Sequence, residues 1–552
     1  MKCEWSAVPG ALGVLVFLLA GCGSDSSIAG AGEIGNPSGQ IAARVVTGSD
    51  SLPVAGSRVR IRTSDYLPPV GLARVGGVTG ETETAADGTF RFDSLAPGSY
   101  TVEVVASGGI GALYRFIMPA RGGHDAATIV AQPLTSVNGS IPEGEFSGPV
   151  AARIFGLERV VYADNPGRFA FADLPAGEYR LRLSATQGDT TRIDVDRVVA
   201  PAGQTVTVSP WDGWDHMAEL VFRPAALALS ASLVSFPLLV RLAAPDFDFG
   251  TGRGSGDDVR FVTTHGIPLP YEIEQWDSAA AKATIWVLLD TLHHAADSQR
   301  VHMYWGNRGV GSQSSGRQVF NAAAGYRAVW HLADTGAVTD ATGSTPPGVN
   351  HGAQGLAAVC GNGLRLVRTE STFVELPAEQ LAVHSAMGSI AFWVRSGFDY
   401  ADHEGMLFYA AQHKGDGFGR DFELHVNFRT SNHVQLVISD TTAMTQSVTS
   451  AAPLNDGQWR HIVAQWEQGK AIELFVDGEL VDSKEHGGSN RLMDGYAAIG
   501  RPHTITGQHF RYADADIDEI RLMSGPVSHD VVKCWYESQR PDSSFLTVRP
   551  VR

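Results

Sequence analysis

Ten residues near the end of the chain, Asp514 to Met523 (DADIDEIRLM), alternate acidic and apolar side chains. Side chains two residues apart in a strand point to the same face, so Asp516 and Asp518 would lie together on one face. Two carboxyl groups on one face could serve as the acid and the nucleophile of a glycosidase, ligate a cation, or line a binding surface that carries out no chemistry. The elements around them must separate these alternatives.

The bulk properties predict several all-β domains. At roughly 100 to 200 residues per domain, a chain of 552 residues is expected to hold three to five. Glycine (62) and proline (27) are frequent, and the apolar share of 43% is that of a globular protein. Short runs rich in Val, Ile, Thr and Phe recur between turn residues, which is typical of strands. The net charge of -17 offers no electrostatic basis for binding nucleic acid, so we expect no such partner.

The amino terminus has the features of a processing signal. An apolar run from Ala11 to Ala20 overlaps the sequence Leu19-Ala20-Gly21-Cys22, which resembles the bacterial lipobox. The resemblance implies that residues 1–21 are removed and that Cys22 receives lipid. A plain anchor or secretory signal is the alternative, but the run is shorter than the ~20 residues that span a bilayer. Residues 22–39 are rich in Ser, Gly and Ala and predict a flexible spacer.

We therefore expect a bacterial envelope protein that is held by its lipid alone. The expected location is the outer membrane, on its periplasmic or its surface face. Of four cysteines, Cys3 falls in the signal and Cys22 is the lipid site, which leaves Cys360 and Cys534. In an oxidising compartment these two predict a disulfide, with two buried free thiols as the alternative.

One phrase occurs twice in the first part of the mature chain. Residues 87–100 (DGTFRFDSLAPGSY) and 166–179 (PGRFAFADLPAGEY) share their pattern of aromatic, leucine and glycine positions. The repeat resembles the carboxypeptidase regulatory-like, transthyretin-like β-sandwich. This resemblance implies two spacer domains, residues 40–130 and 131–210, without catalytic residues. In the first copy the residues expected to point inward are Phe90, Phe92, Leu95 and Tyr100.

A third segment, residues 211–320, consists of strand-length runs with alternating apolar residues. Its phrases are Asp258-Val259-Arg260-Phe261, Tyr271-Glu272-Ile273-Glu274 and Tyr304-Trp305-Gly306-Asn307. They resemble a bacterial domain of unknown function that often precedes laminin G-like modules in envelope proteins. The resemblance implies a β-rich fold and assigns no activity.

A fourth segment, residues 326–540, carries ordered phrases that include DGQWRHIVAQW, FVDGELV and DIDEI. They resemble the laminin G-like, concanavalin A-type jelly roll. Gly478 after Asp477 predicts a type I′ hairpin turn, in which both central residues have positive φ. In the tail, SHDVVKCWYES predicts a helix that is capped by Ser528.

The opening stretch does not match a glycosidase on this jelly roll. The laminarinase-like family presents three acids as E-x-D-x-x-E, and here the corresponding positions are Asp516, Asp518 and Arg521. Since an arginine occupies the place of the third acid, we predict no catalytic residues. A glycoside hydrolase remains a hypothesis for the function, ranked third after the two given below.

A cation fits the acids better, because Ca²⁺ accepts six to eight oxygen ligands in loose geometry. Laminin G-like modules often hold such an ion near a sheet edge. We therefore nominate Asp334, Asp340 and Asp518 as calcium ligands, and ordinary loop aspartates are the alternative.

The predicted function is non-catalytic binding of an extracellular ligand, most plausibly polysaccharide, by the laminin G-like domain. A structural or adhesive protein with surface-protein partners is the alternative. Trp393, Trp459 and Trp466 could stack on sugar rings, but each follows an alternating strand pattern, so we expect them to pack in the core.

Overall fold

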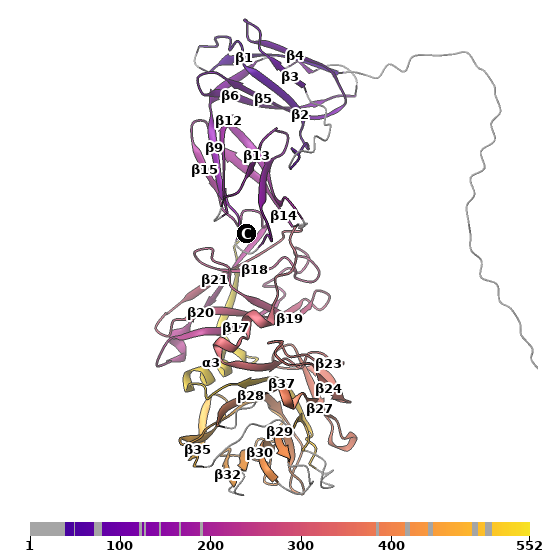
Figure 1. The fold of residues 1–552 in the computed structure, drawn as a ribbon, viewed down its shortest axis with the longest axis vertical. Helices are drawn as coiled ribbons and strands as arrows, with labels where there is room; N and C mark the ends of the chain where they lie inside the picture. The colour runs from indigo at the N-terminus through magenta and orange to yellow at the C-terminus, as the bar shows by residue number, and fades with distance from the viewer. Residues whose placement is uncertain are drawn as a thin grey trace, which may run out of the picture.

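The computed structural model describes residues 39–48, 50–70, 80–120, 124–125, 128–142, 145–164, 167–187, 191–381, 386–413, 420–439, 445–487, 495–502 and 511–551. Cys22, with the predicted signal and spacer, lies outside these ranges. The protein is all-β and its sheets are stacked along one long axis, from the indigo end of the chain to the orange strands (Figure 1). In the described part of the chain, no helix is both long enough and apolar enough to cross a membrane.

The first unit (residues 39–133) is one eight-stranded sheet with the order β3-β2-β5-β6-β8-β1-β4, and β7 pairs with β1. Its strands are β1 (Gly39–Thr47), β2 (Arg58–Thr63), β3 (Gly80–Glu83), β4 (Thr89–Leu95), β5 (Gly98–Ala106), β6 (Ile110–Met118), β7 (His124–Asp125) and β8 (Ile129–Pro133).

The second unit (residues 135–208) has two sheets, with the orders β11-β10-β13-β14 and β12-β9-β15. Its strands are β9 (Thr135–Ser140), β10 (Val150–Ile154), β11 (Val160–Tyr162), β12 (Arg168–Leu174), β13 (Gly177–Ala185), β14 (Arg192–Ala200) and β15 (Thr205–Val208).

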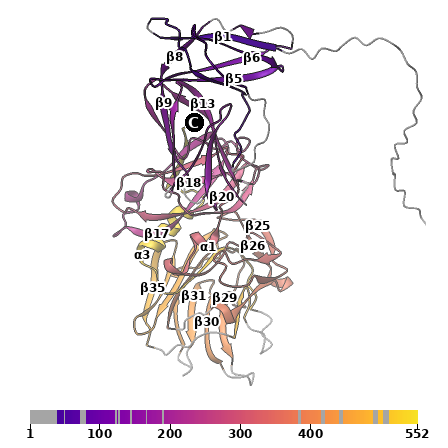
Figure 2. The same ribbon diagram turned by 45° about the horizontal axis from the view of Figure 1, so that its top comes forward.

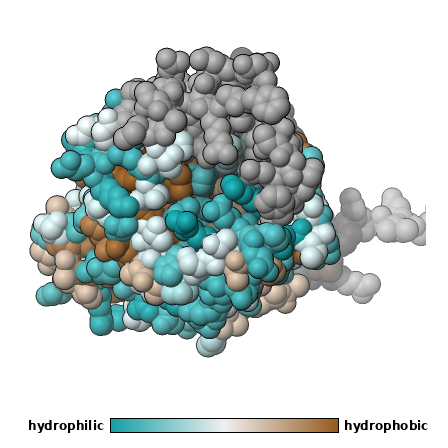
Figure 3. Space-filling view, turned by 90° about the horizontal axis from the view of Figure 1, so that it is seen from below, coloured by the Kyte–Doolittle hydropathy of each residue, from teal (hydrophilic) through white to brown (hydrophobic). Residues whose placement is uncertain are grey.

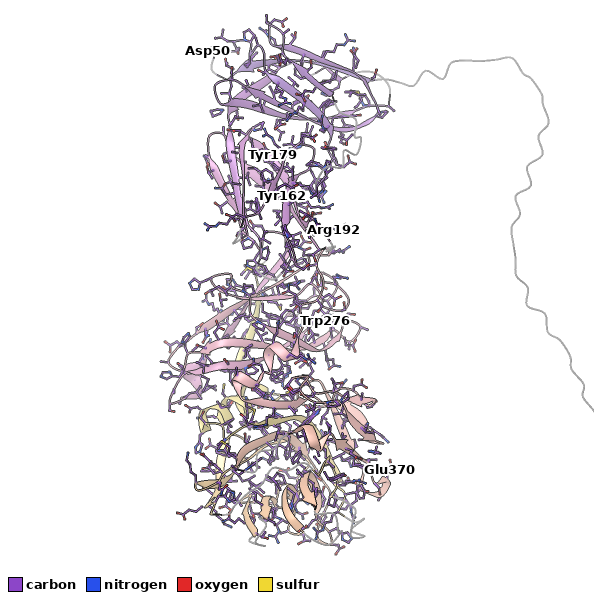
Figure 4. All side chains as sticks on the ribbon, in the orientation of Figure 1. Asp50, Tyr162, Tyr179, Arg192, Trp276 and Glu370 are labelled. Atoms are coloured by element: carbon purple, nitrogen blue, oxygen red, sulfur yellow. The ribbon has the colours of Figure 1, made fainter. Side chains whose placement is uncertain are left out.

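The repeated phrase forms the same structure in both units. It makes β4 and β5 in the first unit and β12 and β13 in the second. In each copy a residue with positive φ, Ser94 (φ 61°) or Asp173 (φ 53°), precedes the inward leucine at a register shift of the strand. The four inward positions are buried in both copies, at Phe90, Phe92, Leu95 and Tyr100 and at Phe169, Phe171, Leu174 and Tyr179, the last of which Figure 4 labels.

The third unit (residues 211–320 with the last strand of the chain) also has two sheets, ordered β18-β21-β16-β38 and β17-β20-β19. Its elements are β16 (His216–Phe222), η1 (Pro224–Leu227), β17 (Leu233–Ala243), β18 (Arg260–Thr263), β19 (Tyr271–Asp277), β20 (Lys282–Leu292), β21 (Gln299–Trp305), α1 (Gly316–Val319) and β38 (Leu546–Pro550). The short η2 (Ala322–Ala324) leads into the fourth unit.

The fourth unit (residues 326–539) is a sandwich of two eight-stranded sheets, which we call the joint-side sheet and the far sheet. The joint-side sheet contains β22 (Tyr326–Trp330), β25 (Gln354–Ala357), β26 (Asn362–Leu366), β28 (Met387–Arg395), β33 (Arg460–Glu467), β34 (Ala471–Val476), β35 (Glu479–Glu485) and β37 (Ala515–Met523). The far sheet contains β23 (Ala337–Val338), β24 (Gly348–His351), β27 (Phe373–Leu376), β29 (Gly405–His413), β30 (Arg420–Phe428), β31 (Val434–Ser439), β32 (Thr445–Thr449) and β36 (Tyr496–Ile499). The helical turns are η3 (Arg368–Glu370), α2 (Ala378–Leu381) and α3 (His529–Gln539).

Two local predictions for this unit are confirmed. Asp477 (φ 52°) and Gly478 (φ 87°) both have positive φ, as a type I′ turn between β34 and β35 requires. Ser528 caps α3, and its hydroxyl accepts a hydrogen bond from the Val531 N–H at 3.3 Å.

The third and fourth units share one apolar core, although the sequence predicts them as separate domains. A single cluster of buried residues joins Phe236 and Trp286 of the third unit to Trp393 and Trp535 of the fourth. The chain also returns from α3 into the third unit, where β38 pairs with β16. Figure 2 accordingly marks the carboxyl end of the chain above α3, away from the fourth unit. Because burial of apolar area stabilises both units through the same residues, we expect them to unfold together.

Shortening Phe545, which is buried in this shared core just before β38, tests the coupling. Phe545→Ala is expected to lower the free energy of unfolding by about 3 kcal/mol, because it leaves a cavity in a packed core. Every tryptophan after Trp5 lies between Trp211 and Trp535, so tryptophan fluorescence in a urea titration follows chiefly these two units, while Trp211 and Trp214 also report on the joint with the second unit.

The matched control is Leu480→Ala, in which the leucine is 41% exposed and the expected change is within about 0.5 kcal/mol. A shared core predicts one fluorescence transition that moves as a whole. Two transitions, of which only one moves, would show that the units unfold separately.

The strand β37 contains a bulge that decides where its acids point. Glu519 has φ 54°, and the pairing of β37 with β28 shifts register at this place. Ile517 and Ile520, three residues apart, therefore both face the core of the fourth unit. The two residues between them, Asp518 and Glu519, both lie on the opposite side, toward the third unit.

Candidate functional site

The far sheet of the fourth unit has one face in the core and one face directed away from it. Along β30 the alternation is plain, because Leu424 and Val426 lie in the core of this unit while His425 and Asn427 lie on the outer face. The residues on this outer face are aromatic and polar as well as apolar. Seen from this end of the molecule, the described surface mixes hydrophilic and apolar side chains (Figure 3).

An aromatic strip crosses the outer face, formed by Tyr409 of β29, Tyr496 of β36, Phe373 of β27 and His351 of β24. The Tyr409 and Tyr496 rings lie 6.3 Å apart, and the His351 ring stacks on Phe373 at 4.1 Å with an interplanar angle of 10°. Arg501 joins the two halves, with its guanidinium 3.7 Å from the Phe373 ring centre and its Nε donating to the Tyr496 hydroxyl at 2.7 Å.

The strip is open at one end. The side chain of His351 is 41% exposed and that of Glu375, with which it forms an ion pair at 3.5 Å, is 47% exposed. Tyr409 and Tyr496 at the other end are buried. Burial raises the pKa of Tyr496, so at neutral pH its phenol stays protonated and can both donate and accept hydrogen bonds.

Two amide side chains lie beside the strip. Asn427 of β30 and Gln435 of β31 are directly opposite each other in the sheet, and both are buried. The oxygens Asn427 Oδ1 and Gln435 Oε1 have no hydrogen-bond partner in the part of the chain that the structure describes. A buried acceptor without a partner costs about 1–3 kcal/mol, so this amide pair can gain free energy by accepting hydrogen bonds from a ligand.

The acids that opened the sequence analysis lie elsewhere, on the joint-side sheet. The Asp516 carboxylate accepts from Arg395 Nε at 2.8 Å and Nη2 at 2.6 Å, and from Arg365 Nη1 at 3.3 Å. Asp518 is fully buried and accepts from the Cys360 N–H at 2.7 Å. Neither carboxylate lies on the outer face of the far sheet.

The nominated calcium ligands do not form a site. Asp334 is exposed and accepts from the Gly336 N–H at 2.7 Å. The buried Asp340 carboxylate accepts instead from four backbone N–H groups and two hydroxyls of the surrounding loop, so its oxygens organise that loop. Asp518 is fully buried, and burial, followed by the adjacent Glu519, raises its pKa well above the ordinary value.

The predicted disulfide is also wrong in this structure, where Cys360 and Cys534 are free thiols. Cys360 lies in the turn between β25 and β26, and Cys534 lies on α3. Both are buried in the core that the third and fourth units share, where each packs as a small apolar side chain. The alternative of two buried thiols therefore applies.

The core role expected of Trp393 and Trp466 is confirmed, since each is 1% exposed. Trp459 is partly buried, with the Arg395 guanidinium 4.9 Å from its ring centre. The sequence analysis missed Tyr409 and Tyr496. Each lies in a strand-length run of the sequence, but alternation identifies outer-face residues only when the core face of the strand is known.

Comparison with known families agrees with this fold. Residues 368–533 match the model of the Concanavalin A-like lectin/glucanases superfamily, and residues 255–325 match that of a domain of unknown function, DUF2341. The chain thus contains one domain of each kind, as their resemblances implied. No curated protein matches the chain.

Solved structures match it at low identity. The binding domain of Paraclostridial Mosquitocidal Protein 1 matches with 14% identity and a TM-score of 0.32, over 39% of this chain and 52% of its own. Domain 4 of the arabinanase AbnA from Geobacillus stearothermophilus, in complex with arabinotriose, matches with 15% identity and a TM-score of 0.32, over 39% of this chain and 98% of its own. The botulinum neurotoxin serotype D binding domain matches with 14% identity and a TM-score of 0.31, over 39% and 52%. The chain thus spans about half the length of the mosquitocidal and neurotoxin structures.

Proposed function

We propose that the fourth unit binds polysaccharide on the outer face of its far sheet, without cleaving it. The observation that carries the proposal is the aromatic strip beside an amide pair whose oxygens have no partner among the described residues. The match to a lectin and glucanase superfamily supports a sugar as the ligand class.

The chemistry of the face suits a sugar chain. Flat aromatic side chains pack against the apolar faces of sugar rings, and their polar tips remain available for hydrogen bonds. Because Asn427, Gln435, Tyr409 and Tyr496 are buried in the free chain, sugar binding requires that they become exposed. Sugar hydroxyls can then donate to the two amide oxygens, and Arg501 adds a donor between the two halves of the strip. The exposed end at His351 and Glu375 is where a long chain would continue beyond the face.

Binding without cleavage is proposed because glycosidases need two carboxyl groups across the scissile bond. Among the side chains that the structure describes on the strands of the far sheet, Glu375 is the one carboxylate. It is occupied by its ion pair with His351.

Replacing Tyr496 tests the site. The full chain is incubated with a panel of insoluble polysaccharides, and bound protein is measured after washing. Tyr496→Ala is expected to weaken retention at least about tenfold, because loss of one aromatic contact costs on the order of 1 kcal/mol or more and the anchor of Arg501 is lost with it.

The matched control is Tyr162→Ala, in which a tyrosine that is 55% exposed on the second unit is removed (Figure 4). It should bind like the parent chain. Retention of the parent on no polysaccharide, or equal loss in both variants, contradicts the proposal, and release of reducing sugar by the parent contradicts its non-catalytic part.

We also propose that the chain is held at the bacterial envelope by lipid on Cys22, with the first and second units as a spacer. The linear stacking of the units (Figure 1) fits this role, because it separates the fourth unit from the amino-terminal end of the described chain. Mass spectrometry of the amino-terminal peptide from the native protein tests the lipid directly, and an unmodified Cys22 would refute it.

A further inference from the structure

A histidine surrounded by carboxylates is buried where the third and fourth units meet. His331 follows β22, Glu519 lies at the bulge of β37, and Glu274 comes from β19 of the third unit. The ligand atoms of these three residues, one from each, all lie within 4.8 Å of one another. His331 Nδ1 contacts Glu519 Oε1 and lies 3.7 Å from Glu274 Oε2.

Each of the three side chains also makes a hydrogen bond to a residue outside the cluster. The His331 Nε2 is 3.2 Å from Glu272 Oε2, so this nitrogen donates to Glu272 and leaves Nδ1 for the other two acids. Such a carboxylate behind an imidazole is a recurring feature of metal-binding histidines, because it fixes the tautomer and the ring orientation.

Hydrogen bonds from outside the cluster also orient its two acids, Glu274 and Glu519. The indole Nε1 of Trp286 donates to Glu274 Oε2 at 2.8 Å, and Arg521 Nη2 donates to Glu519 Oε2 at 3.0 Å. The second hydrogen bond leaves Glu519 Oε1 directed at His331.

An unused acceptor atom provides an independent indication of a ligand. Glu274 has a side chain that is 1% exposed, and its Oε1 has no hydrogen-bond partner in the described structure. Oxygen atoms that are buried without donors are costly unless something else satisfies them, and a cation does so.

We propose that His331 Nδ1, Glu274 and Glu519 bind one divalent transition-metal ion of the zinc type across the joint of the third and fourth units. One imidazole and two carboxylates are ligands that zinc accepts at about 2.0–2.2 Å. Calcium does not suit this set, since it takes six to eight oxygens and no imidazole is needed. The ion ties β19 to β37, so its role is to hold the joint rigid.

Zinc titration of the full chain tests the proposal. The protein is first treated with EDTA and dialysed, and Zn²⁺ binding is then measured by calorimetry together with the melting temperature. One equivalent of zinc per chain and a higher melting temperature are expected. Glu274→Gln keeps the size of the side chain and removes a charged ligand, so it should weaken zinc binding by at least about tenfold.

Two further variants keep the result interpretable. Glu375→Gln changes a carboxylate that is 47% exposed on the far sheet, and it should bind zinc as the parent does. Glu272→Gln retains all three ligands and removes the support behind His331, so about 10–100-fold weaker binding is expected. It serves as the test if Glu274→Gln does not fold.

The proposal is overturned if the folded parent binds no zinc and shows no change in melting temperature. It is also overturned if Glu274→Gln and Glu375→Gln bind zinc equally, or if the parent responds to Ca²⁺ and not to Zn²⁺. Each of these outcomes would show that the cluster is not a zinc site.

Discussion

Arg260→Met is expected to destabilise the third unit and its joint with the second by about 3–5 kcal/mol, because it leaves a buried carboxylate without its partner. Arg260 lies on β18, and its guanidinium binds the Glu145 carboxylate of the second unit, with Nη2 to Oε2 at 2.9 Å. Both side chains are almost inaccessible, at 3% and 2% exposure. The remaining N–H groups of Arg260 donate to backbone carbonyls, so one residue satisfies acceptors in both units.

Urea denaturation followed by tryptophan fluorescence measures this effect, since Trp211 and Trp214 lie in the apolar core at the same joint. The matched control is Arg197→Met, whose ion pair with Glu178 is exposed at 74% and 51% and should contribute within about 1 kcal/mol. Adding Glu145→Gln to Arg260→Met should recover part of the loss, because it removes the unpaired charge. Equal effects of the two single arginine variants would contradict the account of this joint.

His461 should make a contribution to the stability of the third and fourth units that is lost in mild acid. This imidazole is fully buried between Trp393 and Tyr536, and burial, with a smaller contribution from the charge of Arg521, lowers its pKa to about 3. The unfolded chain protonates near the ordinary value of 6.5, so below that pH the unfolded state binds a proton that the folded state does not. The contribution of His461 to stability is therefore complete above about pH 6.5 and falls toward pH 3 at about 1.4 kcal/mol per pH unit.

His461→Phe isolates this contribution, because phenylalanine keeps a ring beside Trp393 and cannot be protonated. Urea denaturation of parent and variant between pH 7 and pH 4.5 gives the difference in stability at each pH. The parent should lose about 2–3 kcal/mol relative to the variant over this range. A difference that does not change with pH would show that His461 is protonated as easily in the folded chain as in the unfolded chain.

Local patterns in the sequence predicted much of the fold. The repeated phrase identified the residues that are buried in both copies, such as Tyr100 and Tyr179. Asp477-Gly478 and Ser528 specified a turn and a helix cap through their own backbone requirements. These features depend on residues that are close in the chain, so a single sequence is enough to predict them.

Long-range features were not predictable in this way. Strict alternation places Asp516 and Asp518 on one face, but the bulge at Glu519 adds this third acid to the same side, toward the third unit. The partner of that acid, His331, lies 188 positions away in the sequence. The sequence around Asp340 suggested a cation site. In the structure, the carboxylate oxygens that would bind calcium accept hydrogen bonds from the loop instead.

The far-sheet site depends on which face of each strand is turned to the core. The strands that carry Tyr409, Tyr496 and the two amides are paired with one another, and these pairings join residues as remote in sequence as Val374 and Ile499. The sequence of a strand shows which side chains alternate between its two faces. Only the assembled sheet shows that these four side chains share its outer face.

The most direct test of the proposed function is a crystal structure of the full chain soaked with the oligosaccharide form of whichever polysaccharide retains it. The account predicts sugar rings against Tyr409 and Tyr496, with hydroxyls within hydrogen-bond distance of Asn427 Oδ1 or Gln435 Oε1. Sugar bound on another unit, or an outer face of the far sheet without sugar at saturating concentration, would contradict it.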